Sequence, residues 1–126
     1  CLALDLSDAP DIAQTIVVSC LGLEIDCDLT GLRTLKIKET DRLLALKNEI
    51  KKLGTELKIT DNSLHLNNVA SLNCDVHILT YNDHRMAMAF APLALRESLY
   101  IENAEVVSKS YPNFWEDLKS LGFKVQ

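Results

Sequence analysis

The sequence predicts an α/β fold (α+β in stricter usage), in which short strands alternate with amphipathic helices. Two observations lead to this prediction. Segments in which polar and apolar residues alternate are interspersed with segments of helical apolar spacing along most of the 126 residues. The chain also resembles itself after a shift of 72 positions, which moves Asp11 onto Asp83 and the expected strand 27–29 onto 99–101. We interpret this as a structural unit of about 70 residues used more than once, because one unit alone would leave its sheet face uncovered.

Composition and charge narrow the class of protein. Hydrophobic residues make up 48% of the chain and charged residues 25%, with four glycines and three prolines, which excludes a disordered or low-complexity protein. Acidic residues outnumber basic ones by 18 to 13, which argues against a nucleic-acid partner, because phosphate backbones require a basic face. No apolar run approaches the roughly 20 residues of a membrane helix, so we expect a soluble, cytoplasmic protein with no membrane partner. Since the chain opens at Cys1 inside an apolar alternation, we expect it to be a piece of a longer protein.

Apolar spacing predicts four helices. We expect them over 10–21, 40–53, 82–95 and 112–121. In the second helix, Thr40 is the expected N-cap and Gly54 the C-terminal stop. The body of the third helix, Met86 to Leu95, is almost wholly apolar and should therefore be buried. The last helix should turn four apolar side chains inward, namely Phe114, Trp115, Leu118 and Leu121.

Six short segments are expected to form strands, since polar and apolar residues alternate in them. They cover 24–29, 35–37, 57–59, 64–66, 76–79 and 99–101. The third and fourth flank the turn signal Thr60-Asp61-Asn62-Ser63, which predicts a hairpin.

The four cysteines predict neither a metal site nor a disulfide. They show no CxxC spacing and no histidine at ligand distance in the sequence. We interpret all four as small buried apolar residues in a reducing cytosol, namely Cys1, Cys20, Cys27 and Cys74.

Charged residues gather at two junctions between an expected strand and an expected helix. The first junction is Lys38-Glu39-Thr40-Asp41-Arg42 and the second is Asn82-Asp83-His84-Arg85. The positive end of the helix dipole disfavours cations in a first turn, so the cations found there need another reason. Forked guanidinium groups beside free backbone N–H groups suit the binding of a carboxylate or phosphate. The clusters therefore indicate a site for an acidic small molecule.

Several residues of these clusters, and Lys109 outside them, also have an ordinary interpretation, and the residues alone leave both interpretations open. Asp41 and Asp83 are typical helix caps. Glu39 would form a capping exchange, or an ion pair with the arginine three residues later. His84 would be an ordinary histidine at a helix start, and Lys109 a solvated loop lysine. On this interpretation the clusters are only a solvated rim.

Both junctions belong to longer motifs. Lys38-Glu39-Thr40-Asp41-Arg42-Leu43 and Tyr81-Asn82-Asp83-His84-Arg85-Met86-Ala87-Met88-Ala89 resemble two signatures of the 5-enolpyruvylshikimate-3-phosphate synthase (3-phosphoshikimate 1-carboxyvinyltransferase) family, in the same order. Pro10-Asp11 and Lys109 with Pro112 resemble two further landmarks at matching separations. The resemblance covers essentially the whole chain and corresponds to roughly the last third of a family member.

This resemblance implies a two-domain enzyme in which each domain holds three βαβαββ units arranged as an inside-out barrel. The chain would be part of the C-terminal domain, with about two units over 1–54 and 55–126, and its partner would be the N-terminal domain of the same chain. The family reaction transfers the enolpyruvyl group of phosphoenolpyruvate to the 5-hydroxyl of shikimate 3-phosphate in aromatic amino acid biosynthesis. It releases phosphate and uses no metal or organic cofactor. The piece alone is expected to be inactive, because positioning both substrates requires both halves of the site.

Two other functions remain open. An enolpyruvyl transferase acting on a UDP-sugar shares the fold but lacks the Lys-Glu-Thr-Asp-Arg string. A non-catalytic anion-binding domain would have kept the motifs after losing activity.

The matching motifs also imply roles at the substrate hydroxyl. Asp11 resembles the carboxylate that contacts the 5-hydroxyl and helps to move its proton. Lys38 resembles a lysine that lies close to the same hydroxyl and to the reacting centre. Thr34 resembles a position that contacts shikimate 3-phosphate, where many family members carry Asn.

Glu39 resembles the acid that protonates the phosphoenolpyruvate methylene, a task that requires its neutral form to be favoured. His84 resembles a histidine that orients this glutamate.

The remaining implied roles concern phosphoenolpyruvate. Arg42 and Arg85 resemble the pair that clamps its carboxylate, which suits forked guanidinium groups. Lys109 resembles a lysine on its phosphate.

Overall fold

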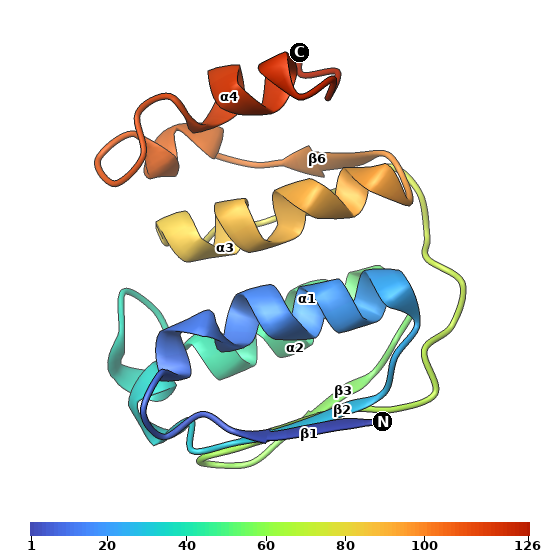
Figure 1. The fold of residues 1–126 in the computed structure, drawn as a ribbon, viewed down its shortest axis with the longest axis vertical. Coiled ribbons are helices and arrows are strands. Elements are labelled where there is room, and N and C mark those ends of the chain that lie inside the picture. Colours follow the sequence, from blue (N-terminus) through green and yellow to red (C-terminus); the bar gives the residue numbers. More distant parts are fainter.

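The computed structural model describes residues 1–126 and confirms the expected alternation of strands and helices (Figure 1). The helices are α1 Ala13–Leu23, α2 Arg42–Lys52, α3 His84–Phe90 and α4 Phe114–Ser120. The strands are β1 Leu2–Asp5, β2 Cys27–Thr30, β3 Leu57–Ile59, β4 Leu64–Leu66, β5 Val76–Ile78 and β6 Leu99–Ile101. Short 3-10 helices cover Pro10–Ile12, Arg33–Ile37, Ala91–Leu95 and Ala104–Val107.

The strands form two sheets. The larger has four strands in the order β1-β2-β4-β3, and the smaller pairs β5 with β6. Strands β1 and β2 run parallel, as do β5 and β6, whereas β4 is antiparallel to both β2 and β3. The predicted hairpin is therefore confirmed, with the backbone N–H of Thr60 donating to Ser63 across its turn.

This pairing groups the elements into two units. Residues 2–66 follow the order βαβαββ, and β5, α3, β6 and α4 repeat the first four elements of that order. The hairpin 57–66 pairs with β2, so a boundary at 54/55 would separate it from its own sheet. We therefore propose that the boundary between the units lies within 67–75.

Helices α1 and α2 cover one face of the four-stranded sheet, and α3 packs against α1 on the side away from that sheet (Figure 1). One apolar cluster of 23 buried residues joins these layers. Its largest members come from all of them, for example Leu21, Leu29, Leu46 and Phe90. Because α3 lies between α1 and the smaller sheet, four of its seven residues are buried, as expected. The expected burial does not extend to the end of the apolar segment, since Leu95 is 76% exposed. None of the helices has the length and apolar character needed to cross a bilayer.

Four predicted elements differ from the observed ones. The helix expected over 10–21 begins as a 3-10 turn over Pro10–Ile12, and α1 itself covers Ala13–Leu23. Residues 35–37 form part of a 3-10 helix rather than a strand, and the Ile37 side chain is 81% exposed. The backbone N–H of Leu35 bonds locally to Leu32, so this turn needs no partner strand. Strand β2 begins at Cys27 rather than 24, because α1 continues to Leu23 and its C-cap, Glu24, has the left-handed conformation. The third helix is α-helical only to Phe90 and ends in a 3-10 turn that contains Pro92.

Three side-chain expectations also need correction. Asp41 rather than Thr40 caps α2, since its carboxylate accepts from the backbone N–H of Leu44. Leu121 does not point inward but is 76% exposed, because it follows the last turn of α4. Two of the four cysteines are exposed rather than buried, namely Cys1 and Cys74.

Candidate functional site

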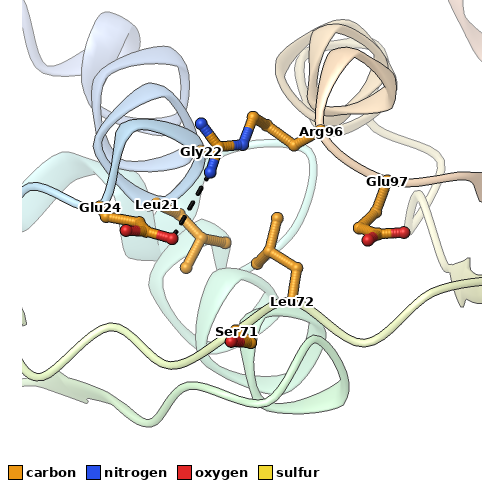
Figure 2. A pocket seen from close by; sticks show the side chains of 7 residues that line it. All are labelled: Leu21, Gly22, Glu24, Ser71, Leu72, Arg96 and Glu97. Carbon is orange, nitrogen blue, oxygen red and sulfur yellow. Dashed lines mark hydrogen bonds and ion pairs between the residues drawn. The ribbon is translucent and has the colours of Figure 1, made fainter.

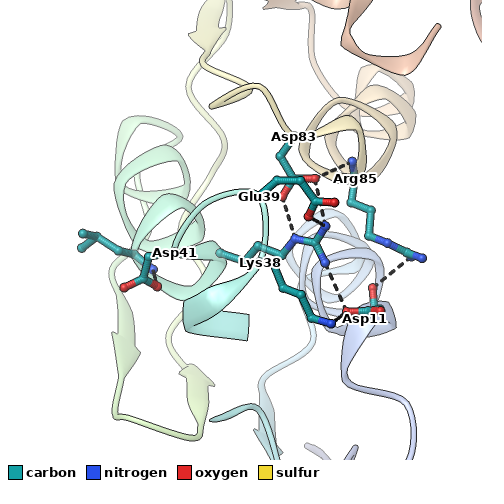
Figure 3. A network of polar contacts seen from close by, with 8 residues as sticks. Asp11, Lys38, Glu39, Asp41, Asp83 and Arg85 are labelled. Carbon is teal, nitrogen blue, oxygen red and sulfur yellow. Dashed lines mark hydrogen bonds and ion pairs between the residues drawn. The ribbon is translucent and has the colours of Figure 1, made fainter. Parts of the chain in front are cut away.

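Six charged side chains are joined by hydrogen bonds and ion pairs where three helices begin, and Figure 3 shows this network. Asp11 lies in the turn before α1, Lys38 and Glu39 lie just before α2, and Arg42 is the first residue of α2. The other two come from the start of α3, where Asp83 is the N-cap and Arg85 is the second residue. The two junctions predicted from the sequence are thus brought together with Asp11. We call these six residues the charged cluster.

Arg42 lies at the centre of the charged cluster with its side chain 2% exposed. Its Nε donates to Asp83 Oδ2 at 2.6 Å, and Nη2 donates to Asp83 Oδ1 at 3.2 Å. Its Nη1 donates to Asp11 Oδ1 at 3.2 Å, and Nη2 also donates to Glu39. A buried guanidinium is tolerated only when its donors are matched by acceptors and its charge is balanced. Three carboxylates satisfy that requirement here.

Asp41 and Asp83 cap helices, as expected. The carboxylate of Asp41 accepts from Leu44 at 3.1 Å, and that of Asp83 accepts from the backbone N–H of Arg85 at 2.9 Å. Asp83 combines this cap with its bonds to Arg42, and its side chain is fully buried. The cap and the ion pair are therefore compatible functions of one carboxylate.

Two cations lie at the edge of the cluster with donors to spare. Lys38 Nζ is 3.6 Å from Asp11 Oδ1, and the lysine side chain is about one third exposed. Arg85 Nη1 donates to the backbone carbonyl of Asp11 at 3.2 Å, and this is its only side-chain hydrogen bond. Their remaining N–H groups are free to bind a small anion.

The carboxyl group of Glu39 is tuned toward its charged form. Its own backbone N–H holds its pKa below the ordinary value, and the charges of Arg42 and His84 act in the same direction. Partial burial and the carboxylate of Asp11 oppose this without reversing it. The direction is opposite to the expectation that the neutral form is favoured in this chain. The difference arises because the backbone N–H of Glu39 and, to a lesser degree, the charge of Arg42 both favour its carboxylate form.

Two expected site residues stay apart from the charged cluster. Thr34 lies in the 3-10 helix before Lys38, and Lys109 lies in the loop before α4. Both side chains are exposed, and neither forms a hydrogen bond or ion pair within the chain. His84, at the first position of α3, contributes to the field at Glu39 but makes no side-chain hydrogen bond.

Two buried polar side chains were not singled out from the sequence. Glu49 on α2 is fully buried, and its carboxylate accepts from Lys52, from the backbone of Leu79 and from Tyr81. Gln14 on α1 is also buried, and neither of its amide atoms has a partner. Glu49 adjoins the apolar positions of its helix, which is the only signal that the sequence offers.

A small pocket lies away from the cluster, at the other end of α1 (Figure 2). It has a volume of about 180 Å³ and lies beside an ion pair of 3.4 Å between Arg96 and Glu24. It includes no residue of the charged cluster. No group of His, Cys, Asp or Glu side chains in the chain is arranged to hold a metal ion.

Comparisons with known proteins identify the family of the chain. The family model described as EPSP synthase (3-phosphoshikimate 1-carboxyvinyltransferase) matches residues 1–118. A 3-phosphoshikimate 1-carboxyvinyltransferase of Bacteroides fragilis is 49% identical over 126 residues, which are 97% of this chain and 30% of that protein. One of Clostridium kluyveri is 35% identical over 98% of this chain and 29% of that protein. The chain thus spans about 30% of the length of these relatives.

Solved structures show the same relationship. An EPSP synthase of Acinetobacter baumannii superposes with a TM-score of 0.81 at 25% identity, covering 94% of this chain and 28% of the other. The family match covers most of the chain, and both motif junctions lie within it. The chain therefore belongs to the EPSP synthase (3-phosphoshikimate 1-carboxyvinyltransferase) family.

Proposed function

We propose that these residues are the C-terminal part of a cytoplasmic enzyme that transfers the enolpyruvyl group of phosphoenolpyruvate to the 5-hydroxyl of shikimate 3-phosphate. The observation that carries the proposal is the meeting of Asp11, Lys38, Glu39, Arg42 and Arg85 at three adjacent helix starts. The relatives bear the name of this activity, so the UDP-sugar alternative is not favoured. The N-terminal domain of the same chain is the partner that this proposal requires.

The hydroxyl of shikimate 3-phosphate would be deprotonated beside Asp11. Its carboxylate is an acceptor that already faces two cations, Lys38 and Arg42, at 3.6 and 3.2 Å. A carboxylate held this way can accept the hydroxyl proton while Lys38 stabilises the negative charge that develops on oxygen. The hydroxyl oxygen then attacks C2 of phosphoenolpyruvate while C3 takes up a proton, which gives a tetrahedral adduct. Loss of phosphate from C2, together with return of one C3 proton to the carboxylate of Glu39, restores the double bond.

Glu39 would supply the proton to the methylene carbon of phosphoenolpyruvate. In the chain alone its pKa is lowered, which favours the carboxylate. A substrate carboxylate bound to Arg42 would compete with Glu39 for the same Nη2 donor and would add a negative charge beside it. Both changes raise the pKa of a carboxyl group. Substrate binding would therefore convert Glu39 into the acid that the reaction needs.

Arg42, Arg85 and Lys109 would bind phosphoenolpyruvate, the two arginines through its carboxylate and the lysine through its phosphate. The charged cluster holds three carboxylates and three cations, so its formal charge is balanced before substrate arrives. A balanced cluster attracts an anion weakly, and the other cations would come from the N-terminal domain. Thr34 would contact shikimate 3-phosphate at the edge of the same site, and His84 would orient Glu39.

A chimeric enzyme tests this proposal. Residues 1–126 replace the matching segment of the Bacteroides fragilis relative, and phosphate release is followed with both substrates present. We expect activity in the chimera and losses of about 100-fold or more in Asp11→Asn and Glu39→Gln, because proton transfer contributes about that much. Lys58→Met, on an exposed position of β3, is the matched control and should change the rate less than twofold.

The possible results separate the alternatives. A folded chimera without activity would favour the non-catalytic anion-binding domain. An active chimera in which both substitutions are harmless would contradict the site assignment. For the chain alone we expect no turnover and millimolar or weaker binding of phosphoenolpyruvate by NMR titration, with shifts centred on 39–42 and 83–85.

A further inference from the structure

A fully buried carboxylate connects α2 to the loop that leads into α3. Glu49 Oε1 accepts from Lys52 Nζ at 2.6 Å and from the backbone N–H of Leu79 at 2.9 Å. Glu49 Oε2 accepts from the phenol of Tyr81 at 2.7 Å. Burial of a charge without such partners is strongly unfavourable, so these three donors explain why the carboxylate can lie here.

The loop that Glu49 binds, residues 79–82, has an unfavourable backbone conformation. Tyr81 and Asn82 are consecutive residues with φ of 56°, in the left-handed region that side chains other than glycine seldom adopt. Such a conformation persists only where the surroundings enforce it. Thr80 Oγ1 donates to the backbone carbonyl of Glu102, and Glu49 binds the residues on both sides of Thr80. The loop is therefore held from α2 and from the end of β6.

The same helix also binds the residue that follows this loop. Arg42, at the start of α2, binds Asp83, while Glu49 lies two turns further along the helix and binds 79–81. Helix α2 thus contacts the segment 79–85 at two points. Because an α-helix is rigid over this length, the two contacts together set where Asp83 and Arg85 lie relative to Arg42.

We propose that Glu49 is a positioning residue of the candidate active site, which fixes the left-handed loop 79–82 on α2 so that Asp83 and Arg85 reach the charged cluster. This inference rests on the proposed function, in which the charged cluster binds substrate. Glu49 itself lies two turns from the cluster and does not touch the reacting groups.

The donors around Glu49 indicate which substitution keeps its hydrogen bonds while removing its charge, and which removes both. In Glu49→Gln, the amide oxygen can still accept from Lys52 and Leu79, and the NH₂ group can donate to the hydroxyl oxygen of Tyr81. In Glu49→Leu, the buried N–H of Leu79 and the hydroxyl of Tyr81 both lose their acceptor. Gln should therefore rescue the positioning that Leu removes.

The chimeric enzyme described above is the system for the test. At a temperature where each variant is folded, we expect Glu49→Leu to lower kcat about tenfold or more, because small displacements of catalytic groups are costly. We expect Glu49→Gln to stay within threefold of the parent. The matched control is Leu57→Ala, a buried truncation on β3, which should lower the melting temperature without changing kcat more than twofold.

A second measurement does not depend on turnover. Exchange of the Arg42 Nε hydrogen with solvent, followed by arginine-selective NMR, reports the buried contact with Asp83. We expect this exchange to be at least tenfold faster in Glu49→Leu and unchanged within threefold in Glu49→Gln. If the parent chimera has no activity, the proposed function fails, and this exchange measurement alone decides the role of Glu49.

Three results would overturn the inference. Glu49→Leu would keep the parental exchange rate of Arg42, or Glu49→Gln would be as impaired as Glu49→Leu, or Leu57→Ala would change the exchange rate as much as either. Should Glu49→Leu not fold, Tyr81→Phe replaces it, since it removes only the bond to Oε2. Faster Arg42 exchange in Tyr81→Phe would support the inference, and an unchanged rate would overturn it.

Discussion

Arg42 and Asp83 form a buried ion pair, with 2.6 Å between Nε and Oδ2, although they are 41 residues apart in the sequence. The pair joins the first residue of α2 to the N-cap of α3. It is thus both a connection between the two repeated units and the centre of the charged cluster. Removing the ion pair should therefore lower the free energy of unfolding of the chain even without substrate.

Asp83→Asn should destabilise the chain by about 3 kcal/mol. Asn keeps the capping acceptor but removes the buried counter-charge of Arg42, and breaking a buried pair from one side typically costs this much. Asp41→Asn is the control, because Asn and Asp cap helices almost equally well and Asp41 has no ion pair, so its effect should stay below about 0.5 kcal/mol. Urea unfolding measures both, and equal effects would show that the pair adds nothing to stability.

Gln14→Met should stabilise the chain by about 1 kcal/mol. Both amide atoms of Gln14 are buried without a partner, which typically costs about 1–3 kcal/mol, and Met has a similar length and adapts to irregular space. Thr15→Met on the exposed side of α1 is the comparison and should change the free energy of unfolding by less than about 0.5 kcal/mol. A lower melting temperature in Gln14→Met would mean that the amide is stabilised in a way the contacts do not reveal.

The four thiols should differ sharply in reactivity. Cys1 and Cys74 are exposed, whereas Cys20 and Cys27 are buried in the core. Burial, reinforced by Cys20, raises the pKa of the Cys27 thiol to about 12, so almost no thiolate exists there near neutral pH. We expect iodoacetamide to label two sites in the folded chain and four in urea, as counted by intact mass. Labelling of Cys27 without denaturant would contradict the packing of β2.

Acid should selectively remove the contribution of Glu39. The folded-state pKa of Glu39 lies below its ordinary value of 4.5, so its stabilising effect is complete above 4.5 and is lost as pH falls through the folded-state value. Its side chain is 46% exposed, so we expect less than about 1 kcal/mol at pH 7. The difference in unfolding free energy between the parent and Glu39→Gln should therefore shrink below pH 4.5. A difference that grows toward low pH would contradict the assigned direction of the shift.

The sequence predicts long periodic elements better than short ones. Helix α2 and the hairpin at 57–66 were predicted because several apolar positions and a turn signal agree in each. The segment 35–37 offers only three alternating residues, and these fit a 3-10 turn equally well. The prediction that Leu121 points inward was wrong for a related reason, since helical spacing does not show where the last turn of a helix ends.

The sequence also predicted some features of the candidate site and not others. The two motifs predicted that cations gather at helix starts, and the structure brings them together with Asp11. The motifs did not predict that Arg42 would be closed to solvent, because its burial depends on three carboxylates from different segments. The burial of Glu49 was missed for the same reason, since its partners at 79–81 are distant in sequence. The roles of all the site residues stay predictions, and Thr34 and Lys109 lie apart from the charged cluster.

The two units differ greatly in how much holds them together. Residues 2–66 contribute a four-stranded sheet and most of the core, whereas β5 and β6 form a pair with nothing beyond it, and α4 buries only Leu118. Regions with few buried contacts unfold locally at a lower free energy than regions that contribute most of the core. On gentle warming, the chain should unravel from its C-terminal end while the first βαβαββ unit stays intact, and proteases should trim it from Gln126 inward.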